Sequence, residues 1–346
     1  MAESKPSVEL STKQLVDAVL KCIDRERERE IVARRFGLFE RRETLEQIGE
    51  MLGITRERVR QLEKSVVTKL RSMAEQGSIP NLNDFQNKLL DLLKNRGNVA
   101  RVSAVTAELT DSQDREEQSR IAFLSQLCPE ITVISEDDNY YNSVGVAKLS
   151  DEKKLKSRVE SLIETIKKLG EPKSIEVIAK TANISDPKEA EALASTSKHL
   201  ATLNGRWGLV KWPMVNPKNI RDKIYVILKE NGKHMHFNEI SDAIKKSEFK
   251  RKDVTTQAIH NELIKDKRFV LVGRGIYALK EWGYERGTVA DIIAEVLREA
   301  NEPLHRDEIV KRVLKSRFVK ETTILLNLQG KPQFKRVAKA TYALAE

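Results

Sequence analysis

The sequence predicts a mainly α-helical protein, in which a helix-turn-helix head is followed by tandem modules that each end in a small β-hairpin. Apolar residues recur at helical spacing through most of the chain, and aromatic residues make up only 5% of it. Beyond residue 80, four segments of similar length repeat one order of helical and β-type patterns. This composition suits small helical cores better than a large sheet.

The charge of the chain favours a polyanionic partner. Of the 346 residues, 33% are charged and the net charge is +10. Residues 214–346 alone carry 27 basic and 18 acidic side chains, so the excess of cations lies in the C-terminal third. We therefore expect double-stranded DNA as a partner.

The sequence also predicts a cytoplasmic protein that makes no membrane contact. Cys22 and Cys128 stand far apart without metal-ligand spacing, which indicates free thiols in a reducing compartment. No apolar run approaches the roughly 18 residues of a membrane span, and the N-terminus lacks the apolar core of a signal peptide. A DNA-binding protein in this compartment would be associated with the nucleoid.

The head is predicted at residues 1–77 and contains a helix-turn-helix. Thr44 can cap the first helix, with Gln47 as its capping-box partner, and Gly53 ends that helix. Thr55 can cap the second helix. Apolar residues at helical spacing should face inward on both helices: Leu45, Ile48, Leu52, Val59, Leu62, Val66 and Leu70.

The outward side chains of the second helix are chemically suited to DNA bases. They are Arg56, Glu57, Arg60, Gln61 and Lys64. In a helix-turn-helix, the second helix enters the major groove, where arginine pairs with guanine, glutamine with adenine and glutamate with cytosine. The alternative is a solvated helix whose charged side chains pair with one another.

A longer segment around these helices carries a family resemblance. Residues 24–72 contain R-E-x-x-I-V-x-x-R-F-G-L, then T-L-E-x-I-G, then T-R-E-R-V-R-Q-L-E. This order resembles region 4 of the sigma-70 family of bacterial sigma factors. The resemblance implies binding to the promoter −35 element and to the flap of the RNA polymerase β subunit. It implies base contacts by Arg56, Glu57, Arg60 and Gln61, and DNA-backbone contacts by Arg27, Thr44, Leu45, Gln47 and Lys64.

A complete sigma factor also needs region 2, which traps melted −10 bases on an aromatic-rich helix. No other part of the sequence resembles region 2, and the 3 Trp, 6 Tyr and 9 Phe residues form no cluster. We therefore expect promoter recognition without promoter opening.

Four modules are predicted after the head, at residues 82–147, 151–213, 218–282 and 287–346, separated by breaks rich in Gly, Pro, Asn or Ser. Each opens with an amphipathic helix and closes on a hairpin, and the last three have a second helix between them. Helices followed by a hairpin are the plan of a winged helix. The first wing carries Glu136, Asp137 and Asp138, which would repel phosphate, so we expect this module to contact protein.

Residues 218–282 resemble the HARE-HTH winged-helix family through MHFNEISDAI, TTQAIHNELIKDKRFVLVGRGIYAL and Trp282, and residues 287–346 resemble a degenerate copy. The family occurs in the delta subunit of bacterial RNA polymerase, in chromatin regulators and in restriction enzymes. In a DNA-bound winged helix, the third helix enters the groove and the wing contacts the backbone. The resemblance implies DNA contacts by Lys250, Arg251, Lys252, Thr255, Thr256, Gln257, His260, Asn261 and Arg274.

No catalytic arrangement stands out. His234 and His236 have no third metal ligand nearby, and the sequence has no phosphate-binding glycine loop. We therefore predict no enzyme activity, metal, cofactor or small-molecule substrate. The main hypothesis is a DNA-binding transcription regulator that also docks on RNA polymerase. The alternatives are a polymerase- or nucleoid-associated scaffold that uses its modules for protein contacts, and the specificity part of a DNA-processing system.

Overall fold

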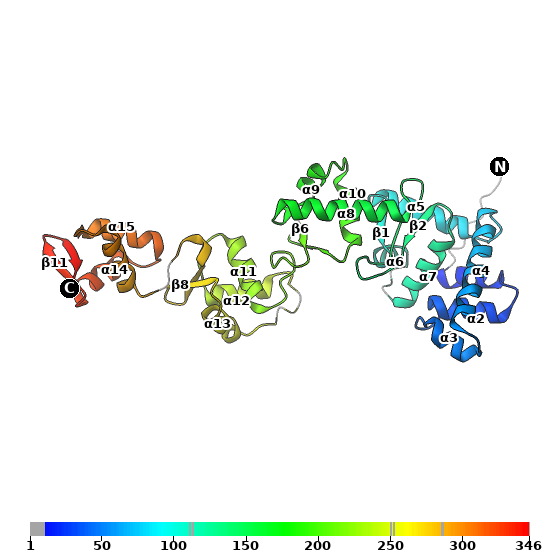
Figure 1. The fold of residues 1–346 in the computed structure, drawn as a ribbon, viewed down its shortest axis with the longest axis horizontal. Coiled ribbons are helices and arrows are strands. Elements are labelled where there is room, and N and C mark those ends of the chain that lie inside the picture. Colours follow the sequence, from blue (N-terminus) through cyan, green and yellow to red (C-terminus); the bar gives the residue numbers. More distant parts are fainter. Residues whose placement is uncertain are drawn as a thin grey trace, which may run out of the picture. The chain divides into compact units, whose positions relative to one another are not determined.

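A computed structural model describes residues 11–110, 112, 114–249, 251, 253–284 and 287–345. The chain forms two compact units, Met1–Val210 and Lys211–Glu346. Both units are mostly helical, and their small sheets are antiparallel and three-stranded (Figure 1). The prediction of a mainly α-helical protein with small β-hairpins is therefore confirmed.

From residue 11 onward, the head contains four helices, α1 (Thr12–Lys21), α2 (Glu26–Phe36), α3 (Leu45–Leu52) and α4 (Arg56–Glu75). Local signals in the sequence set their ends. Ser11 and Thr44 each form a capping box with the glutamine three residues later, at the start of α1 and α3. Gly37 and Gly53 end α2 and α3 with φ of 65° and 64°, a conformation that favours glycine.

Two repeats complete the first unit, and each has the order helix, short strand, helix, helix, hairpin. The first consists of α5 (Leu82–Asn95), β1 (Val99–Arg101), α6 (Val102–Thr110), α7 (Arg115–Leu127), β2 (Ile131–Ile134) and β3 (Ser143–Val146). The second consists of α8 (Glu152–Leu169), β4 (Lys173–Ser174), α9 (Ile175–Thr181), α10 (Pro187–Thr196), β5 (Leu200–Leu203) and β6 (Arg206–Leu209). The first repeat thus contains two helices, α6 and α7, where the sequence pattern indicated none.

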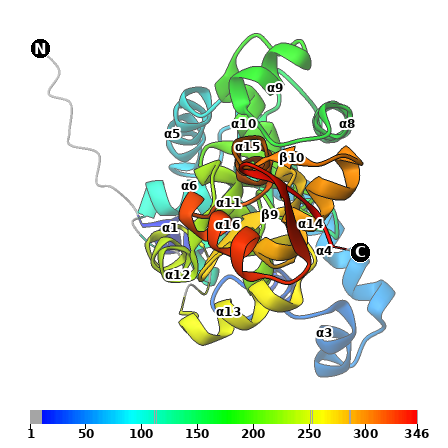
Figure 2. The same cartoon turned by 90° about the vertical axis from the view of Figure 1, so that its left-hand side faces the viewer.

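The second unit holds two more repeats with the same order of elements. The third repeat consists of α11 (Ile220–Asn231), β7 (Met235–His236), α12 (Phe237–Lys246), α13 (Thr256–Lys265), β8 (Phe269–Gly273) and β9 (Ile276–Leu279). The fourth consists of α14 (Val289–Ala300), β10 (Leu304–His305), α15 (Arg306–Ser316), α16 (Glu321–Gly330), β11 (Phe334–Ala338) and β12 (Thr341–Leu344). Figure 2 labels its three helices, α14, α15 and α16, and their apolar side chains form one core with those of the sheet. In all four sheets, the second hairpin strand is the central one.

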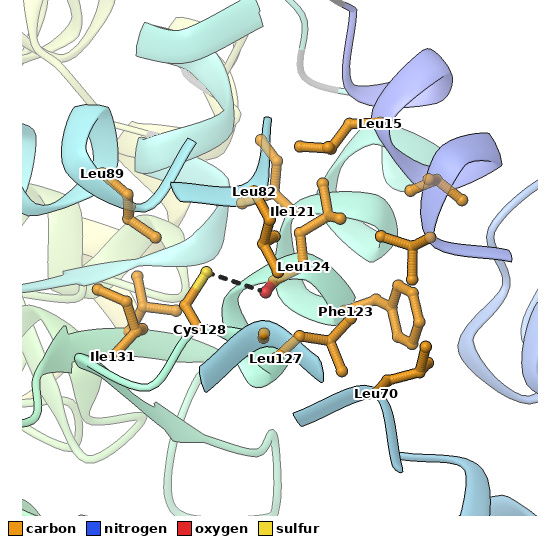
Figure 3. Close-up of a cluster of buried hydrophobic side chains, with 14 of the residues drawn as sticks. Leu15, Leu70, Leu82, Leu89, Ile121, Phe123, Leu124, Leu127, Cys128 and Ile131 are labelled. Carbon is orange, nitrogen blue, oxygen red and sulfur yellow. Dashed lines mark hydrogen bonds between the residues drawn. The ribbon is translucent and has the colours of Figure 1, made fainter. Parts of the chain in front are cut away.

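The head and the first repeat share one hydrophobic core. Apolar side chains of α1 and of the C-terminal half of α4 pack with those of α5, α7 and the first sheet. Figure 3 shows Phe123 and Leu124 of α7 in the cluster with Leu15 of α1 and Leu70 of α4. Burial of each such side chain contributes about 1.5–3 kcal/mol. The predicted boundary between residues 77 and 82 therefore lies across a continuous core.

The second repeat packs on the first through backbone and side-chain contacts. The Tyr141 amide donates to the Thr196 carbonyl at 2.8 Å, and the Lys198 amide donates to the Asn139 carbonyl at 2.8 Å. Nε of Arg101 in the first repeat also donates to the Ser195 carbonyl of the second repeat. These contacts, together with the shared core, join the head and the first two repeats into one compact unit.

Two hairpin turns contain glycines with positive φ in different surroundings. Gly205 has φ +70° and a Cβ there would meet nothing within 4 Å. Gly275 has φ +71°, but a Cβ there would lie 2.5 Å from Nε2 of His236. The hairpin of the third repeat is therefore packed against the start of α12 as well as being tightly turned.

We predict that Gly275→Ala lowers the stability of its repeat more than Gly205→Ala does. Both substitutions force alanine into the left-handed region, which costs about 1–2 kcal/mol, but only the first also displaces a neighbouring side chain. Calorimetric unfolding of the wild type and the two variants measures the difference. Equal losses would show that the contact with His236 does not restrict the turn.

Candidate nucleic-acid interface

Helices α3 and α4 form a tight helix-turn-helix. The turn runs through Gly53, and the Ile54 amide donates to the Gly49 carbonyl at 2.9 Å. Gly49 is needed for this close approach, because a Cβ there would lie 2.7 Å from the Ile54 carbonyl oxygen. Thr55 then caps α4, and its side chain accepts a hydrogen bond from the Arg58 amide at 3.2 Å.

A separate apolar cluster fixes the orientation of α4 in this motif. Ile31 of α2, Ile48 of α3 and Val59 of α4 are completely buried against one another. The predicted inward residues Leu45, Leu52 and Leu62 pack around this cluster and are partly buried. The opposite side of α4 therefore faces solvent, and it carries the predicted base-contacting residues Arg56, Glu57, Arg60 and Gln61, all exposed, with Lys64.

The exposed side chains of α4 pair with one another in the free protein. Nε and an Nη of Arg60 donate to the two carboxylate oxygens of Glu57 at 2.8 and 2.7 Å, and Gln61 donates to the same carboxylate at 3.3 Å. Arg56 forms an ion pair with Glu46 of α3 at 2.8 Å. The hydrogen bond from Arg60 is the main reason that the pKa of Glu57 is lowered to about 2. To contact a base, Glu57 would therefore have to give up its hydrogen bonds with Arg60 and Gln61.

The residues predicted to contact the DNA backbone have local roles in the free protein. Thr44 and Gln47 cap α3 through reciprocal hydrogen bonds of 2.9 and 3.2 Å. Leu45 is the first residue of α3, where backbone N–H groups lack helical acceptors and can bind an anion. An Nη of Arg27 donates to the Leu52 carbonyl at 2.5 Å, at the C-terminal end of α3. Lys64 is exposed on α4.

The third helices of the four repeats differ in what they contact. In the first repeat, α7 packs against α1, α2 and α4 of the head. In the second repeat, α10 packs against β1 of the first repeat as well as against its own repeat. In the third and fourth repeats, α13 and α16 pack on the other elements of their own repeat. Contacts within the first unit thus cover much of α7 and α10.

In the third repeat, the predicted DNA-contacting residues fall into an exposed and a half-buried group. Arg251, Thr255, Gln257, Asn261 and Arg274 are exposed, and Gln257 donates to Asn261 at 3.0 Å. Thr256 and His260 are half-buried. The Thr256 hydroxyl lies 3.1 Å from the Ser241 hydroxyl, and the ring of His260 lies 5.0 Å from that of Phe237. Lys250 and Lys252 lie outside the described residues.

The acidic wing of the first repeat contacts the second repeat. Lys198 forms an ion pair with Glu136 at 2.8 Å, and Lys156 forms one with Asp137 at 3.5 Å. Backbone donors at Asn139 and Tyr140, aided by Lys156, lower the pKa of Asp137. The acidic wing therefore contacts protein, as expected, and the protein surface that it contacts belongs to the second repeat of the same chain.

Comparisons with known proteins identify the head. Residues 25–72 match the family model of sigma-70, region 4. The chain is 48% identical over 62 residues to an RNA polymerase sigma factor, RpoD, of Helicobacter pylori, which covers 17% of this chain and 9% of the relative. It is 49% identical over 47 residues to an RNA polymerase sigma factor, sigB, of Arabidopsis thaliana, covering 13% of this chain and 8% of the relative.

The predicted resemblance of the head is thereby confirmed, and it is local. The chain spans about 9% of the length of the first curated relatives that it matches. The HARE-HTH resemblance of residues 218–346 stays a prediction. No described helix is long and apolar enough to cross a membrane.

Two residues beside the predicted site were missed by the sequence analysis. Glu46 of α3 pairs with Arg56, and Arg58 of α4 is exposed and donates to Gln61 at 3.4 Å. Arg58 lies outside the apolar positions 59, 62, 66 and 70 of α4, which could have indicated a surface residue. The pairing of Glu46 depends on how α3 and α4 cross, so no sequence signal marked it.

We predict that Arg60→Ala raises the pKa of Glu57 from about 2 toward the ordinary value of 4.5. Because folding lowers this pKa, the carboxylate stabilises the head fully above about pH 4.5, and its contribution is lost as the pH falls toward 2. An NMR titration of labelled glutamate carboxyl carbons measures the shift. Arg58→Ala, which removes the same charge from α4, should leave the pKa low. A wild-type Glu57 that titrates near 4.5 would contradict the pairing.

Proposed function

We propose that the protein is a DNA-binding transcription regulator of the cytoplasm, in which the head binds a promoter element of the −35 type and also docks on the flap of the RNA polymerase β subunit. The observation that carries this proposal is the exposed side of α4, where Arg56, Glu57, Arg60 and Gln61 lie on a helix-turn-helix of the sigma region 4 family. The proposed role is promoter recognition, without the promoter opening of a complete sigma factor.

The proposed recognition step is an exchange of hydrogen-bond partners. In the free head, Arg60 and Gln61 both donate to Glu57. In the major groove, Arg60 would donate to guanine, Gln61 would pair with adenine, and Glu57 would accept from the amino group of cytosine. These side chains are exposed, so the ion pair between Arg60 and Glu57 contributes little free energy. Exchanging it for base contacts therefore costs little free energy.

The N-terminal end of α3 is suited to position the head on the duplex. Its capping box occupies the amides of Thr44 and Gln47, and the amides of Leu45 and Glu46 at the start of the helix have no intrahelical acceptor. We propose that these amides and Arg27 bind phosphates beside the groove, which fixes the register without selecting sequence. Lys64 would add a further phosphate contact from α4.

We propose that the repeats are winged helices, the last two of the HARE-HTH type, and that the third repeat adds a second DNA contact. The order of elements and the central position of the last strand support a winged-helix plan in each repeat. In the third repeat, Gln257 and Asn261 are exposed on α13 and Arg274 is exposed on the wing. Association with the nucleoid would follow from these two DNA contacts.

A scaffold role is the second candidate, because one set of observations favours it. The third helices of the first two repeats pack on protein, and the acidic wing of the first repeat pairs with lysines of the second. These surfaces of half of the repeats are thus suited to protein contact, and the described contacts lie within the same chain. In this alternative the head also contacts protein, and the repeats bridge partners of polymerase or the nucleoid.

We predict that Arg60→Ala combined with Gln61→Ala removes the preference of the full chain for its selected duplex. Each base contact of this kind contributes about 1–3 kcal/mol of discrimination, so the affinity ratio of selected to scrambled duplex should fall at least tenfold. Fluorescence anisotropy on duplexes enriched from a random pool measures this ratio. Binding to scrambled duplex should persist, because phosphate contacts supply it.

Lys21→Ala is the matched control, since it removes one exposed positive charge from α1 of the head. It should leave the ratio unchanged. Selection that yields no consensus sequence would refute base recognition by the head. Purified core polymerase that fails to bind the full chain would refute polymerase docking and leave DNA recognition standing.

We predict that Arg274→Ala weakens binding to all duplexes alike. Losing one phosphate contact should reduce the slope of log affinity against log salt concentration by about 1. Lys229→Ala is the control, because Lys229 of α11 is already paired with Glu281 at 2.5 Å. If the slope changes equally in both variants, the cause is the change in net charge, and the proposed phosphate contact of the wing is wrong.

A further inference from the structure

We propose that Arg120, on the third helix of the first repeat, is a positioning residue for the head. It holds residues 37–44, the segment that joins α2 to α3, and through this segment it sets the orientation of the helix-turn-helix. Its consequence for DNA binding rests on the proposed function, whereas its effect on the segment does not.

The guanidinium of Arg120 is buried between the first repeat and the head. Arg120 is 7% exposed, and its Nε donates to the Leu38 carbonyl at 2.8 Å, across 82 positions of sequence. Its two Nη atoms donate to Glu117 and, at 3.0 Å, to Glu116 on the same helix. Each of the three guanidinium nitrogens of Arg120 therefore donates to a different residue.

The neighbours of Arg120 extend this connection to other parts of the head. The Thr12 hydroxyl of α1 donates to the carboxylate of Glu117. The ring of Phe39, next to Leu38, lies under the guanidinium with its centroid 6.0 Å away. One buried group thus connects α1, α7 and the α2–α3 segment.

The segment is held on α2 near its end and on α7 near its start. The Glu43 amide donates to the Arg34 carbonyl at 3.0 Å, and Nε of Arg42 donates to the Arg35 carbonyl at 3.1 Å, whereas Arg120 connects its start to α7. Gly37 turns the chain at φ 65°, and Leu38 then inserts a completely buried side chain into the shared core. The apolar cluster of the helix-turn-helix, at Ile31, Ile48 and Val59, is separate from that core. Three contacts therefore set the orientation of α3 relative to the shared core. They are the packing of α3 on α2, its packing on α4, and the segment that Arg120 contacts.

Arginine is required at this position by its shape. Its planar fork can serve the Leu38 carbonyl and both carboxylates at once, whereas a lysine ammonium lacks this fixed geometry. An apolar side chain would remove the donor of the Leu38 carbonyl and the cationic partner of the half-buried Glu117, which would keep the hydrogen bond from Thr12. The start of the segment would then lose its hydrogen bond to α7, while the bonds of Glu43 to α2 and the core around Phe123 persist.

The test compares Arg120→Leu, Arg120→Lys and Arg115→Leu in the full chain. Arg115 is exposed on the same helix, so its variant removes the same charge without touching the segment. Amide hydrogen exchange is followed by mass spectrometry at residues 37–44 and at α4. The affinity ratio of selected to scrambled duplex is measured on the same samples.

For Arg120→Leu, exchange at residues 37–44 should accelerate at least tenfold while α4 remains protected, and the affinity ratio should fall about fivefold. Arg120→Lys should restore part of both effects, and Arg115→Leu should behave as the wild type. Unchanged exchange in Arg120→Leu, or an equal increase throughout the chain, would overturn the proposal. A wild type without duplex preference would refute base recognition, while the exchange results would still decide the role of Arg120.

Discussion

The packing of α7 against the head is the contact on which the rest of the first unit depends. It combines an apolar surface, with Phe123 and Leu124 buried beside Leu15 and Leu70, and a buried polar contact from Arg120 to the Leu38 carbonyl. The apolar part supplies most of the stability, because burial of large side chains is the dominant favourable contribution to folding. The polar part supplies direction, since its hydrogen bonds form in only one arrangement of α7 and the α2–α3 segment.

This contact shows how one order of elements serves two purposes in the chain. The third helix of the first repeat presents large apolar residues and is buried on the head. The third helix of the third repeat presents Gln257 and Asn261 to solvent. The hairpins differ in the same way, because an acidic wing pairs with lysines of its neighbour and the wing at Arg274 is exposed. The repeats share one order of elements, and the residues that differ between them therefore decide whether a third helix or a wing packs inside the chain or faces solvent.

The sequence predicted the head well and the first repeat poorly, for physical reasons. The capping box at Thr44, the glycine turn at Gly53 and the apolar spacing on α4 are local signals, and the structure contains each of them. The helix α7 was missed because it is buried on more than one side, so its apolar residues form no single stripe. The alternative of charge pairing on α4 was also foreseen, since Glu57 and Arg60 lie one turn apart.

The sequence by itself thus determined the local elements of this protein: where helices begin and end, which side of α4 faces solvent, and the family of the head. Short-range periodicity and capping carry that information, because they act over a few residues. Only the tertiary structure decided which repeats are packed internally and which polar groups meet, as in Arg120 with Leu38 and Glu46 with Arg56. These contacts join separate elements, and their geometry exists only after the helices have packed.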